Sequence, residues 1–334
     1  MILNTFDLSG KVAIVTGCDT GLGQGMAVGL AQAGCDIVGI NIVEPVDTIA
    51  KIEALGRKFL SLKADVSKID ELPHLVDQAV TTFGRVDILV NNAGIIRRDD
   101  AVDFTESDWD DVIDVNLKSL FFTCQAFARA ALPRGRGKIV NIASLLSFQG
   151  GIRVPSYTAS KHGVAGLTKL MANEWAAKGL NVNAIAPGYI ETNNTEALRA
   201  DPARSQAILD RIPAGRWGRP EDIGQTAVFL AAPASDYING AVLNVDAGVD
   251  YRLRVLKQAQ LFKSPLTHEN KVWMAQRFSA LTQTQLQSQE PIIINKRIVE
   301  TIGHTEDVLW CEYSELCLKP RSPADFIEIA NIYN

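Results

Sequence analysis

The sequence predicts an α/β protein: a doubly wound parallel sheet of about seven strands with helices on both faces, followed by a C-terminal appendage of undefined fold. Two observations predict this fold class. Between Lys11 and Asp246, short apolar runs alternate with longer segments of helical period. The runs are rich in Val and Ile without strict alternation, which is typical of strands buried on both faces.

Seven apolar runs are the predicted strands. They are Val12–Thr16, Asp36–Asn41, Phe59–Ala64, Val86–Val90, Lys138–Ile142, Asn181–Ile185 and Ala241–Val245. The segments between them are long enough for crossover helices, which parallel neighbours require. The clearest predicted helices are Gln24–Ala33, Ser67–Phe83, Ser107–Ala131 and Ser156–Ala177.

The composition restricts the kinds of partner that the protein could bind and the cellular compartment in which we expect it. The 334 residues carry 38 acidic and 33 basic side chains, a formal charge of -5, which does not attract nucleic acid or an anionic membrane. Asp7 and Gly10 interrupt the amino-terminal stretch where a signal peptide would be apolar, so we expect a cytoplasmic protein with no membrane span. The five cysteines include no CxxC pair and indicate ordinary thiols.

The composition changes near Gly248. The strand and helix alternation stops there, and residues 282–289 are rich in Gln. We therefore predict two domains, 1–248 and 249–334. Within the second, residues 291–298 are expected to form one strand and residues 323–332 a short helix. His268, His304, Cys311 and Cys317 stand too far apart for a metal site, and no metal is predicted.

A phosphate cradle is predicted where the first strand meets the first helix. Backbone N–H groups and the positive end of a helix can meet a pyrophosphate there, and glycines remove the Cβ atoms that would block its approach. The spacing differs from the GxGxxG fingerprint, so a purely structural turn is the alternative. The candidate cofactor-binding residues of this turn are Gly17, Asp19, Thr20, Gly21, Leu22 and Gly23.

Residues at the end of the second strand predict which dinucleotide is bound. Asn41 stands where a carboxylate normally takes the ribose hydroxyls, with Glu44 close behind it. A 2′-phosphate would need Arg or Lys, whereas this corner offers Asn41 and Asp19, so NAD is favoured over NADP. Asp65 and Val66, after the third strand, are expected to meet the adenine, with a helix cap as the alternative role of Asp65.

Tyr157 and Lys161 are the candidate acid/base pair. Four residues apart on a predicted helix, they lie on one face. A free phenol has a pKa near 10, and we expect the neighbouring ammonium to lower it. Ser144, just past the fifth strand, is placed to hold the substrate oxygen that Tyr157 protonates.

Further candidates follow other strands, at the edge where open parallel sheets bind ligands. The turn after the fourth strand supplies Asn92, Ala93 and Gly94. Asn116, a poor helix former, lies inside the predicted helix Ser107–Ala131 and is therefore a functional candidate. The remaining cofactor-binding candidates follow the sixth strand and are Pro187, Gly188, Ile190 and Thr192.

Together these motifs resemble the short-chain dehydrogenase/reductase family, with its Rossmann-like fold, over residues 1–248. TGxxxGxG at 16–23, NNAG at 91–94, Ser144, YxxxK at 157–161 and PGxxxT at 187–192 occur in the family's order. The resemblance implies a tetrad of Asn116, Ser144, Tyr157 and Lys161, with Lys161 also on the nicotinamide ribose. It further implies that Thr192 contacts the carboxamide and that the protein is a homo-oligomer, a tetramer.

Residues 17–27, 36–45, 147–161 and 209–218 resemble family members that act on six-carbon keto-acid sugars in pectin and uronate breakdown. The resemblance implies reversible hydride transfer to a sugar carbonyl. The substrate carboxylate needs a cation, and Arg153 is the first candidate, with Arg97 and Arg98 next. Gln149 is a candidate partner for a sugar hydroxyl.

The tail resembles a different family. Residues 249–254, 272–282 and, above all, 291–334 are similar to an internal piece of the ATPase family that includes the cell-division protein ZapE. No GxxxxGK[ST] loop occurs in the chain, so we expect no ATP hydrolysis. We interpret the tail as a fused fragment, with a regulatory appendage as the alternative.

Two other functions remain open on the sequence alone. The same core could reduce a 3-oxoacyl thioester or another polyol, because fold and tetrad do not set the substrate. Alternatively, the protein is a non-catalytic, dinucleotide-bound scaffold whose tail recruits a partner. The complete set of catalytic residues argues against a scaffold.

Overall fold

The computed structural model describes residues 1–250, 292–294 and 316–318. Contacts divide the chain into a unit of residues 1–252 and a unit of residues 253–334. Val249 and Asp250 are buried in the first unit. The boundary after residue 248 remains a prediction.

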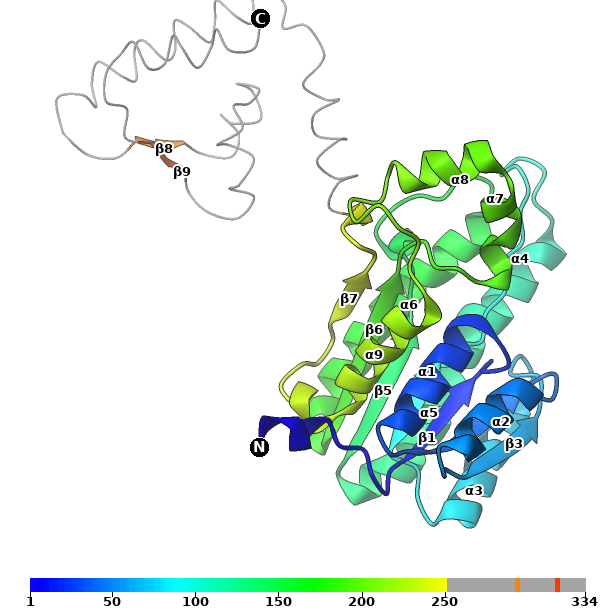
Figure 1. Cartoon of the computed structure of the whole chain (residues 1–334), viewed down its shortest axis with the longest axis vertical. Helices are drawn as coiled ribbons and strands as arrows, with labels where there is room; N and C mark the ends of the chain where they lie inside the picture. The colour runs from blue at the N-terminus through cyan, green and yellow to red at the C-terminus, as the bar shows by residue number, and fades with distance from the viewer. Residues whose placement is uncertain (251–291, 295–315, 319–334) are drawn as a thin grey trace, which may run out of the picture. The chain divides into compact units, whose positions relative to one another are not determined.

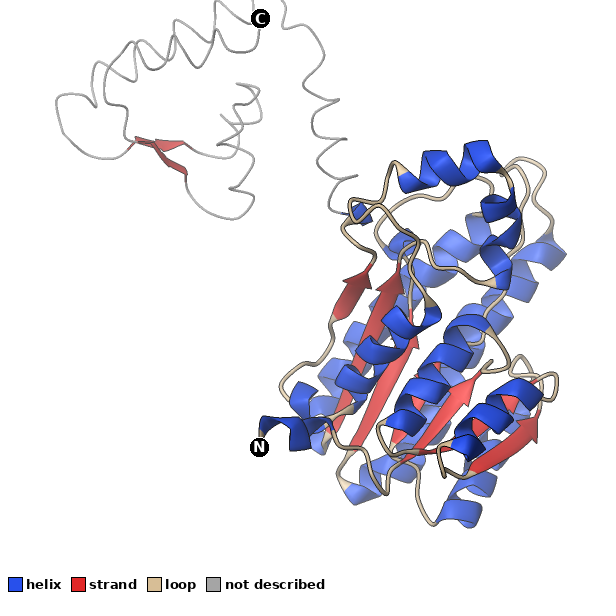
Figure 2. Ribbon diagram, viewed as in Figure 1, coloured by secondary structure: helices blue, strands red, loops and turns tan. Residues whose placement is uncertain are grey.

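The first unit is built on a seven-stranded parallel sheet in the order β3-β2-β1-β4-β5-β6-β7 (Figures 1 and 2). Chain order reverses between β1 and β4, which creates the switch point where open α/β sheets bind ligands. The strands are β1 Val12–Thr16, β2 Asp36–Asn41, β3 Phe59–Lys63, β4 Ile88–Asn91, β5 Gly137–Ile142, β6 Leu180–Pro187 and β7 Val242–Val245. The predicted doubly wound sheet is confirmed.

The strands are continuously apolar because each supplies two cores. Val12 and Ile14 of β1 pack into one hydrophobic cluster, whereas Ala13 and Val15 pack into another on the opposite face. Successive side chains of a strand point to opposite faces, so both sets must be apolar. The continuous Val and Ile runs therefore reflect helices on both sides of the sheet.

Three helices supply the buried side chains on each face, and Figure 1 shows the two layers. One layer holds α1 Gly21–Gln32, α2 Val46–Ala54 and α9 Pro220–Ala231. The other holds α3 Leu72–Phe83, α5 Ser119–Ala131 and α6 Pro155–Trp175. Beyond the strand arrowheads lie α7 Glu196–Ala200 and α8 Pro202–Leu209 (Figure 1).

Helices α1 and α9 touch through glycines. A Cβ on Gly25 would lie 2.7 Å from backbone atoms of Pro220, and one on Gly224 would lie 2.5 Å from the Gly25 carbonyl oxygen. Contacts this close leave no room for a side chain, so the glycines set how closely the helices approach. This contact holds the amino-terminal turn of α1 in place.

The predicted helix Ser107–Ala131 is three pieces in the structure. It divides into α4 Glu106–Ile113, a π-helical segment Asp114–Lys118 and α5. Such π segments are rare and often lie at functional sites, where they re-aim a side chain. Here the segment contains Asn116.

Other predicted bounds differ by a few residues. The helix predicted from Ser67 is α-helical only from Leu72, after a short 3-10 turn. The fourth strand begins at Ile88, not Val86, and the carboxylate of Asp87, just before it, pairs with Arg85 and with Arg134. Helices α2, α7, α8 and α9 were not predicted.

In the second unit the described residues form two short antiparallel strands, β8 Ile292–Ile294 and β9 Leu316–Leu318. Strand β8 lies inside the strand predicted at 291–298. Its partner β9 was not predicted. The helix predicted at 323–332 lies outside the described residues.

Among the residues that the structure describes, no helix is both long and apolar enough to cross a bilayer. Three free cysteines, Cys18, Cys35 and Cys124, are buried in the described part of the first unit.

Candidate active site

The candidate residues converge at the carboxyl ends of the strands, around the switch point between β1 and β4. A Cβ on Gly21 would lie 3.3 Å from the Thr192 side chain, which places the segment after β6 against the glycine turn after β1. A Cβ on Gly17 would lie 3.1 Å from the Ala93 Cα atom. Three segments far apart in sequence therefore share one edge of the sheet.

The glycine turn has a backbone that only glycine adopts readily. Gly17 and Gly21 have φ values of 64° and 56°, in the left-handed region that favours glycine. A Cβ on Gly23 would lie 1.9 Å from the Gly17 carbonyl oxygen. The three glycines are thus required by the shape of the turn itself.

The turn also fits a phosphate ligand. Thr20 is the N-cap of α1 but its side chain makes no capping hydrogen bond, and no acidic residue lies in the first turn. The first N–H groups of a helix need acceptors, and the helix dipole favours an anion there. The pyrophosphate of a dinucleotide would supply both the acceptors and the charge.

The turn after β4 is tied directly to the turn after β1. The Thr16 hydroxyl accepts hydrogen bonds from the backbone N–H of Asn92 and of Ala93, both at 3.0 Å, and the Asn92 amide donates to the Gly17 carbonyl at 2.7 Å. Thr16 was not singled out from the sequence. A threonine as the last residue of a buried strand, directly before a glycine turn, was the available signal.

Asn41 is held inward at the end of β2. It is 3% exposed, and its side-chain oxygen accepts a 2.6 Å hydrogen bond from the Cys18 backbone N–H. Glu44 accepts a hydrogen bond from Ser61 at 2.8 Å. Asn41 thus supports the glycine turn, and its contact with a ribose remains a prediction.

Asp65 closes a local turn after β3. Its carboxylate accepts hydrogen bonds from the backbone N–H of Ser67 at 3.0 Å and from the Ser67 hydroxyl at 2.8 Å. Asp65 does not cap a helix, because the helices that follow have Lys68 and Glu71 as their N-caps, and its contact with adenine remains a prediction. Val66 is 8% exposed.

Tyr157, Ser144 and Lys161 lie together at the end of β5. The Lys161 Nζ atom lies 5.5 Å from the centre of the Tyr157 ring and donates a 2.7 Å hydrogen bond to the Ile142 carbonyl oxygen. Ser144 is hydrogen-bonded to the Tyr157 phenol. Its hydroxyl oxygen also accepts a bond from the Leu146 backbone N–H at 3.1 Å.

The expected lowering of the phenol pKa is not what this structure gives. Burial raises the pKa of Tyr157 above its usual value, against smaller lowering effects from the Ser144 hydrogen bond and the charge of Arg98. Burial also lowers the pKa of Lys161 to about 8. The prediction neglected desolvation, which disfavours the charged forms of both side chains.

Asn116 holds the segment that follows the turn after β4. Its side chain accepts a 2.8 Å hydrogen bond from the Ile95 N–H and donates a 2.9 Å bond to the Ile95 carbonyl oxygen. It also donates to the Ser160 hydroxyl at 3.4 Å. The π segment thereby aims an amide at two elements of the site at once.

The segment after β6 is fixed by backbone hydrogen bonds. The Gly188 N–H donates to the Val245 carbonyl at 3.0 Å, and a Cβ on Gly188 would lie 2.7 Å from the Asp246 Cα atom. Ile190 is 6% exposed and bridges to Gly218. Pro187, the last residue of β6, leads directly into this fixed segment.

The three candidate arginines differ in their partners. Arg153 forms ion pairs with Asp99 and Asp100 at 3.5 and 2.9 Å. Arg97 pairs with two aspartates of α4 at 3.3 and 3.1 Å. Arg98 is exposed, forms no ion pair with a described residue, and its charge acts on Tyr157. The geometry therefore favours Arg98 over the first-ranked Arg153.

Gln149 is held by the last described residue of the first unit. Its amide donates a 2.7 Å hydrogen bond to the carboxylate of Asp250, which is 3% exposed and also accepts a 3.1 Å bond from Asn244. Gln149 is partly buried and follows Ser144 by one short turn. This contact ties the end of the first unit to the loop that precedes Tyr157.

Comparison with known proteins identifies the first unit. The family model described as enoyl-(acyl carrier protein) reductase matches residues 17–250. The 2-dehydro-3-deoxy-D-gluconate 5-dehydrogenase of Escherichia coli K12 is 68% identical over 249 residues, which cover 74% of this chain and 98% of that protein. The chain belongs to the short-chain dehydrogenase/reductase family. It is a dehydrogenase of the oxidoreductase class, as the sequence predicted.

Other relatives of the dehydrogenase agree. The Bacillus subtilis enzyme with the same name is 57% identical over 248 residues, 73% of this chain and 96% of that protein. A solved structure from Agrobacterium tumefaciens, provisionally described as a 2-deoxy-D-gluconate 3-dehydrogenase with bound NADP, is 64% identical with a TM-score of 0.69. It covers 74% of this chain and 98% of that one.

A second family model, described as AFG1-like ATPase, matches residues 223–334 of the dehydrogenase. The match includes the whole tail and confirms the predicted resemblance of the tail to an ATPase family. It overlaps the dehydrogenase match between residues 223 and 250.

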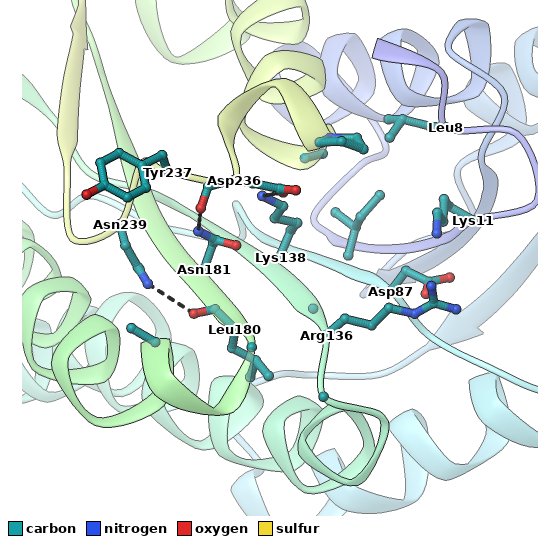
Figure 3. Close-up of a pocket in the computed structure, with 17 residues that line it drawn as sticks. Leu8, Lys11, Asp87, Arg136, Lys138, Leu180, Asn181, Asp236, Tyr237 and Asn239 are labelled. Carbon is teal, nitrogen blue, oxygen red and sulfur yellow. Dashed lines mark hydrogen bonds and ion pairs between the residues drawn. The ribbon is translucent and has the colours of Figure 1, made fainter. Parts of the chain in front are cut away.

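A hollow in the described part of the dehydrogenase lies away from this site. It has a volume of about 670 Å³ and is lined by Lys11, Asp87, Gly137 and Leu180, which precede or begin β1, β4, β5 and β6 (Figure 3). Lys138 pairs with Asp236 beside it, at 2.6 Å. The hollow is therefore at the amino ends of the strands, opposite the edge that carries Tyr157.

Proposed function

We propose that this dehydrogenase interconverts 2-dehydro-3-deoxy-D-gluconate and 3-deoxy-D-glycero-2,5-hexodiulosonate, with NADH as the reductant of the diulosonate. The observation that carries the proposal is the 68% identity to the E. coli enzyme named for this reaction, across 98% of its length. The site supports it, because a phenol, a hydroxyl and an ammonium stand where a carbonyl could be reduced. The reaction would belong to pectin and uronate breakdown in the cytoplasm, carried out by a homo-tetramer.

The chain's own residues would hold the coenzyme and move the proton. A nicotinamide coenzyme, when bound, supplies the hydride. The glycine turn and the uncapped start of α1 would hold its pyrophosphate, and Lys161 its nicotinamide ribose. Thr192 would contact the carboxamide. Ser144 would hold the substrate carbonyl oxygen while Tyr157 donates its proton to that oxygen, and Asn116 would keep a proton path open to Lys161.

A neutral phenol suits the reductive direction. Burial holds the pKa of Tyr157 above its usual value, so the phenol carries the proton that a reduced carbonyl must receive. Oxidation of the alcohol needs the phenolate instead. We therefore expect the oxidative rate to rise with pH over a range in which the reductive rate does not.

NAD is the proposed coenzyme on the residues of the β2 corner. The turn offers Asp19 and the strand end offers Asn41 and Glu44, none of which attracts a 2′-phosphate. NADH should give the higher kcat/KM; equal values with NADPH would contradict this choice.

Arg98 is the proposed partner of the substrate carboxylate. Its backbone is fixed on both sides, by the Asn116 bonds to Ile95 and by the 3.1 Å bond from the Asp99 N–H to the Arg153 carbonyl. Arg98→Ala should raise KM for the keto-acid sugar at least tenfold more than KM for an uncharged ketone, because charge-assisted hydrogen bonds are the strong ones.

Arg97→Ala is the matched control, because Arg97 is adjacent in sequence but engaged by aspartates. It should change both Michaelis constants little. Equal effects of Arg98→Ala on the acid and on the uncharged ketone would exclude its role as carboxylate partner.

Reduction of another carbonyl is the second candidate function. The 3-oxoacyl-[acyl-carrier-protein] reductase of Thermotoga maritima is 40% identical over 244 residues, and the gluconate 5-dehydrogenase of Gluconobacter oxydans is 43% identical over 250. NADH oxidation should be measured with the diulosonate, a 3-oxoacyl thioester, 5-ketogluconate and no substrate. Fastest turnover with the diulosonate is expected. Turnover with none would favour a dinucleotide-bound scaffold.

A further inference from the structure

Arg199 has a buried donor without an acceptor. It lies on α7, in the segment that follows Thr192. Its Nε atom is buried and has no hydrogen-bond partner among the described residues, and its Nη2 atom donates to the Thr192 carbonyl oxygen at 3.2 Å. A guanidinium carries five N–H donors, and a buried donor left unpaired is destabilising. An acceptor from outside the described protein would relieve this.

Thr192 connects Arg199 to the glycine turn. The Thr192 Cγ2 atom is 3.3 Å from a Cβ built on Gly21, in the middle of the glycine turn. Arg199 is bonded to the backbone of this same threonine. The guanidinium is therefore hydrogen-bonded to a residue whose side chain packs against the glycine turn, the proposed pyrophosphate cradle.

The cradle lacks a cation of its own. Residues 16–24 include no Lys or Arg and include Asp19, whereas a pyrophosphate brings two negative charges. The uncapped start of α1 contributes only partial positive charge. Arginine is well suited to supply the rest, because its planar donors match phosphate oxygens in pairs.

We propose that Arg199 binds the pyrophosphate of the coenzyme from the segment that follows Thr192. The inference rests on the proposed use of a nicotinamide dinucleotide, but not on the identity of the sugar. The Nε and the remaining Nη donors would bind the phosphate oxygens, while Nη2 keeps its bond to Thr192. Arg199 thus joins α7 to the bound coenzyme.

The test measures binding without turnover. Dissociation constants of NADH, ADP-ribose and adenosine are measured for the full chain and for Arg199→Gln. Arg204→Gln is the matched control, because Arg204 is an exposed arginine on the neighbouring α8. Arg199→Gln should weaken NADH and ADP-ribose about tenfold or more, and leave adenosine within twofold. Arg204→Gln should leave all three within twofold.

Each other outcome overturns the proposal in a recognisable way. A loss confined to NADH would mean that Arg199 acts only through Thr192, since ADP-ribose has no carboxamide. An equally weakened affinity for adenosine would indicate that the substitution disturbs the fold. Arg199→Lys, which keeps the charge, would then fail to restore ADP-ribose binding. A higher KM for the keto acid with unchanged ADP-ribose binding would assign Arg199 to the substrate carboxylate.

Failure of the proposed function is distinguishable from these results. Wild-type protein that binds ADP-ribose but does not reduce the diulosonate would remove only the substrate assignment. Wild-type protein that binds neither NADH nor ADP-ribose would overturn both proposals.

Discussion

Tyr157 is partly buried and Lys161 is buried, and burial disfavours the charged form of each side chain. Burial raises the pKa of the phenol and lowers the pKa of the ammonium. In the described protein, therefore, neither group shifts the pKa of the other in the way that the sequence predicted. The hydrogen bond from Ser144 and the charge of Arg98 act in the opposite direction on Tyr157. Several neighbouring groups together therefore set the pKa of Tyr157, the proposed proton donor.

Removing the phenol hydroxyl tests its proposed role. Tyr157→Phe should leave NADH binding within about twofold and lower turnover on the order of a thousandfold, because proton transfer by a positioned group contributes about that much. Fluorescence titration with NADH and steady-state kinetics provide the two measurements. Full turnover by this variant would exclude Tyr157 as the proton donor.

Lys161 links stability to pH. Its pKa is about 8 in the folded protein, against a usual value of 10.5. Between pH 8 and pH 10.5, therefore, Lys161 is protonated in the unfolded chain but mostly neutral in the folded protein. Its contribution to the free energy of unfolding rises with pH over this range. Below pH 8 the buried ammonium destabilises the fold by about 3 kcal/mol, at about 1.4 kcal/mol per unit.

Lys161→Met removes that dependence. The free energy of unfolding of the variant minus that of the wild type should fall by about 3 kcal/mol between pH 7 and pH 10.5. Taking the difference cancels the titration of the other lysines and leaves the lost bond to Ile142 as a constant. Urea titrations at the two pH values measure it, and a difference independent of pH would contradict the buried, shifted lysine.

At the scale of elements, the contact between α1 and α9 fixes the glycine turn. A Cβ on Gly25 would lie 2.7 Å from the Pro220 backbone, which cannot move without shifting α9. Gly25→Ala should therefore destabilise the protein by about 1–3 kcal/mol and weaken coenzyme binding. Thermal unfolding and NADH titration provide the measurements.

Gly166→Ala is the control for helix propensity. Gly166 lies within α6, and a Cβ there would meet nothing within 4 Å. This substitution should stabilise the protein by about 0.5–1 kcal/mol, since alanine forms helices better than glycine. Similar effects of the two substitutions would show that close packing of α1 on α9 is not what requires Gly25.

Local patterns predict the elements well where both faces of a strand are buried. Strands β1 and β2 have the predicted bounds because polar residues mark where their apolar runs start and end. The π segment around Asn116 escapes such reasoning, because it is fixed by bonds to Ile95 and Ser160, far away in sequence.

The candidate site, too, could be predicted only in part from the sequence. Glycine spacing and the Tyr157–Lys161 interval are visible in the sequence, and the structure brings these residues together. Partners are not visible: Arg153 is engaged by Asp99 and Asp100, and Asn41 by Cys18, through contacts that only the folded chain creates. Candidate side chains could therefore be predicted, but not which of them remain available to a ligand.

At the scale of the whole molecule, the chain joins two units of different family resemblance. The first matches 98% of the length of the E. coli relative within 249 residues. A chain ending at Arg252 should therefore keep its turnover with NADH and the diulosonate within about twofold. Steady-state kinetics of the shortened and full chains test this, and loss of activity in a folded shortened chain would assign the tail a role in catalysis.

Transfer of a labelled hydride tests the central claim most directly. The dehydrogenase is incubated with NADH carrying deuterium at C4 on the reacting face, together with 3-deoxy-D-glycero-2,5-hexodiulosonate, and the product is examined by mass spectrometry and NMR. We expect 2-dehydro-3-deoxy-D-gluconate with one deuterium at C5. Product without deuterium at C5, or no product from either face of the labelled coenzyme, would contradict hydride transfer to this sugar.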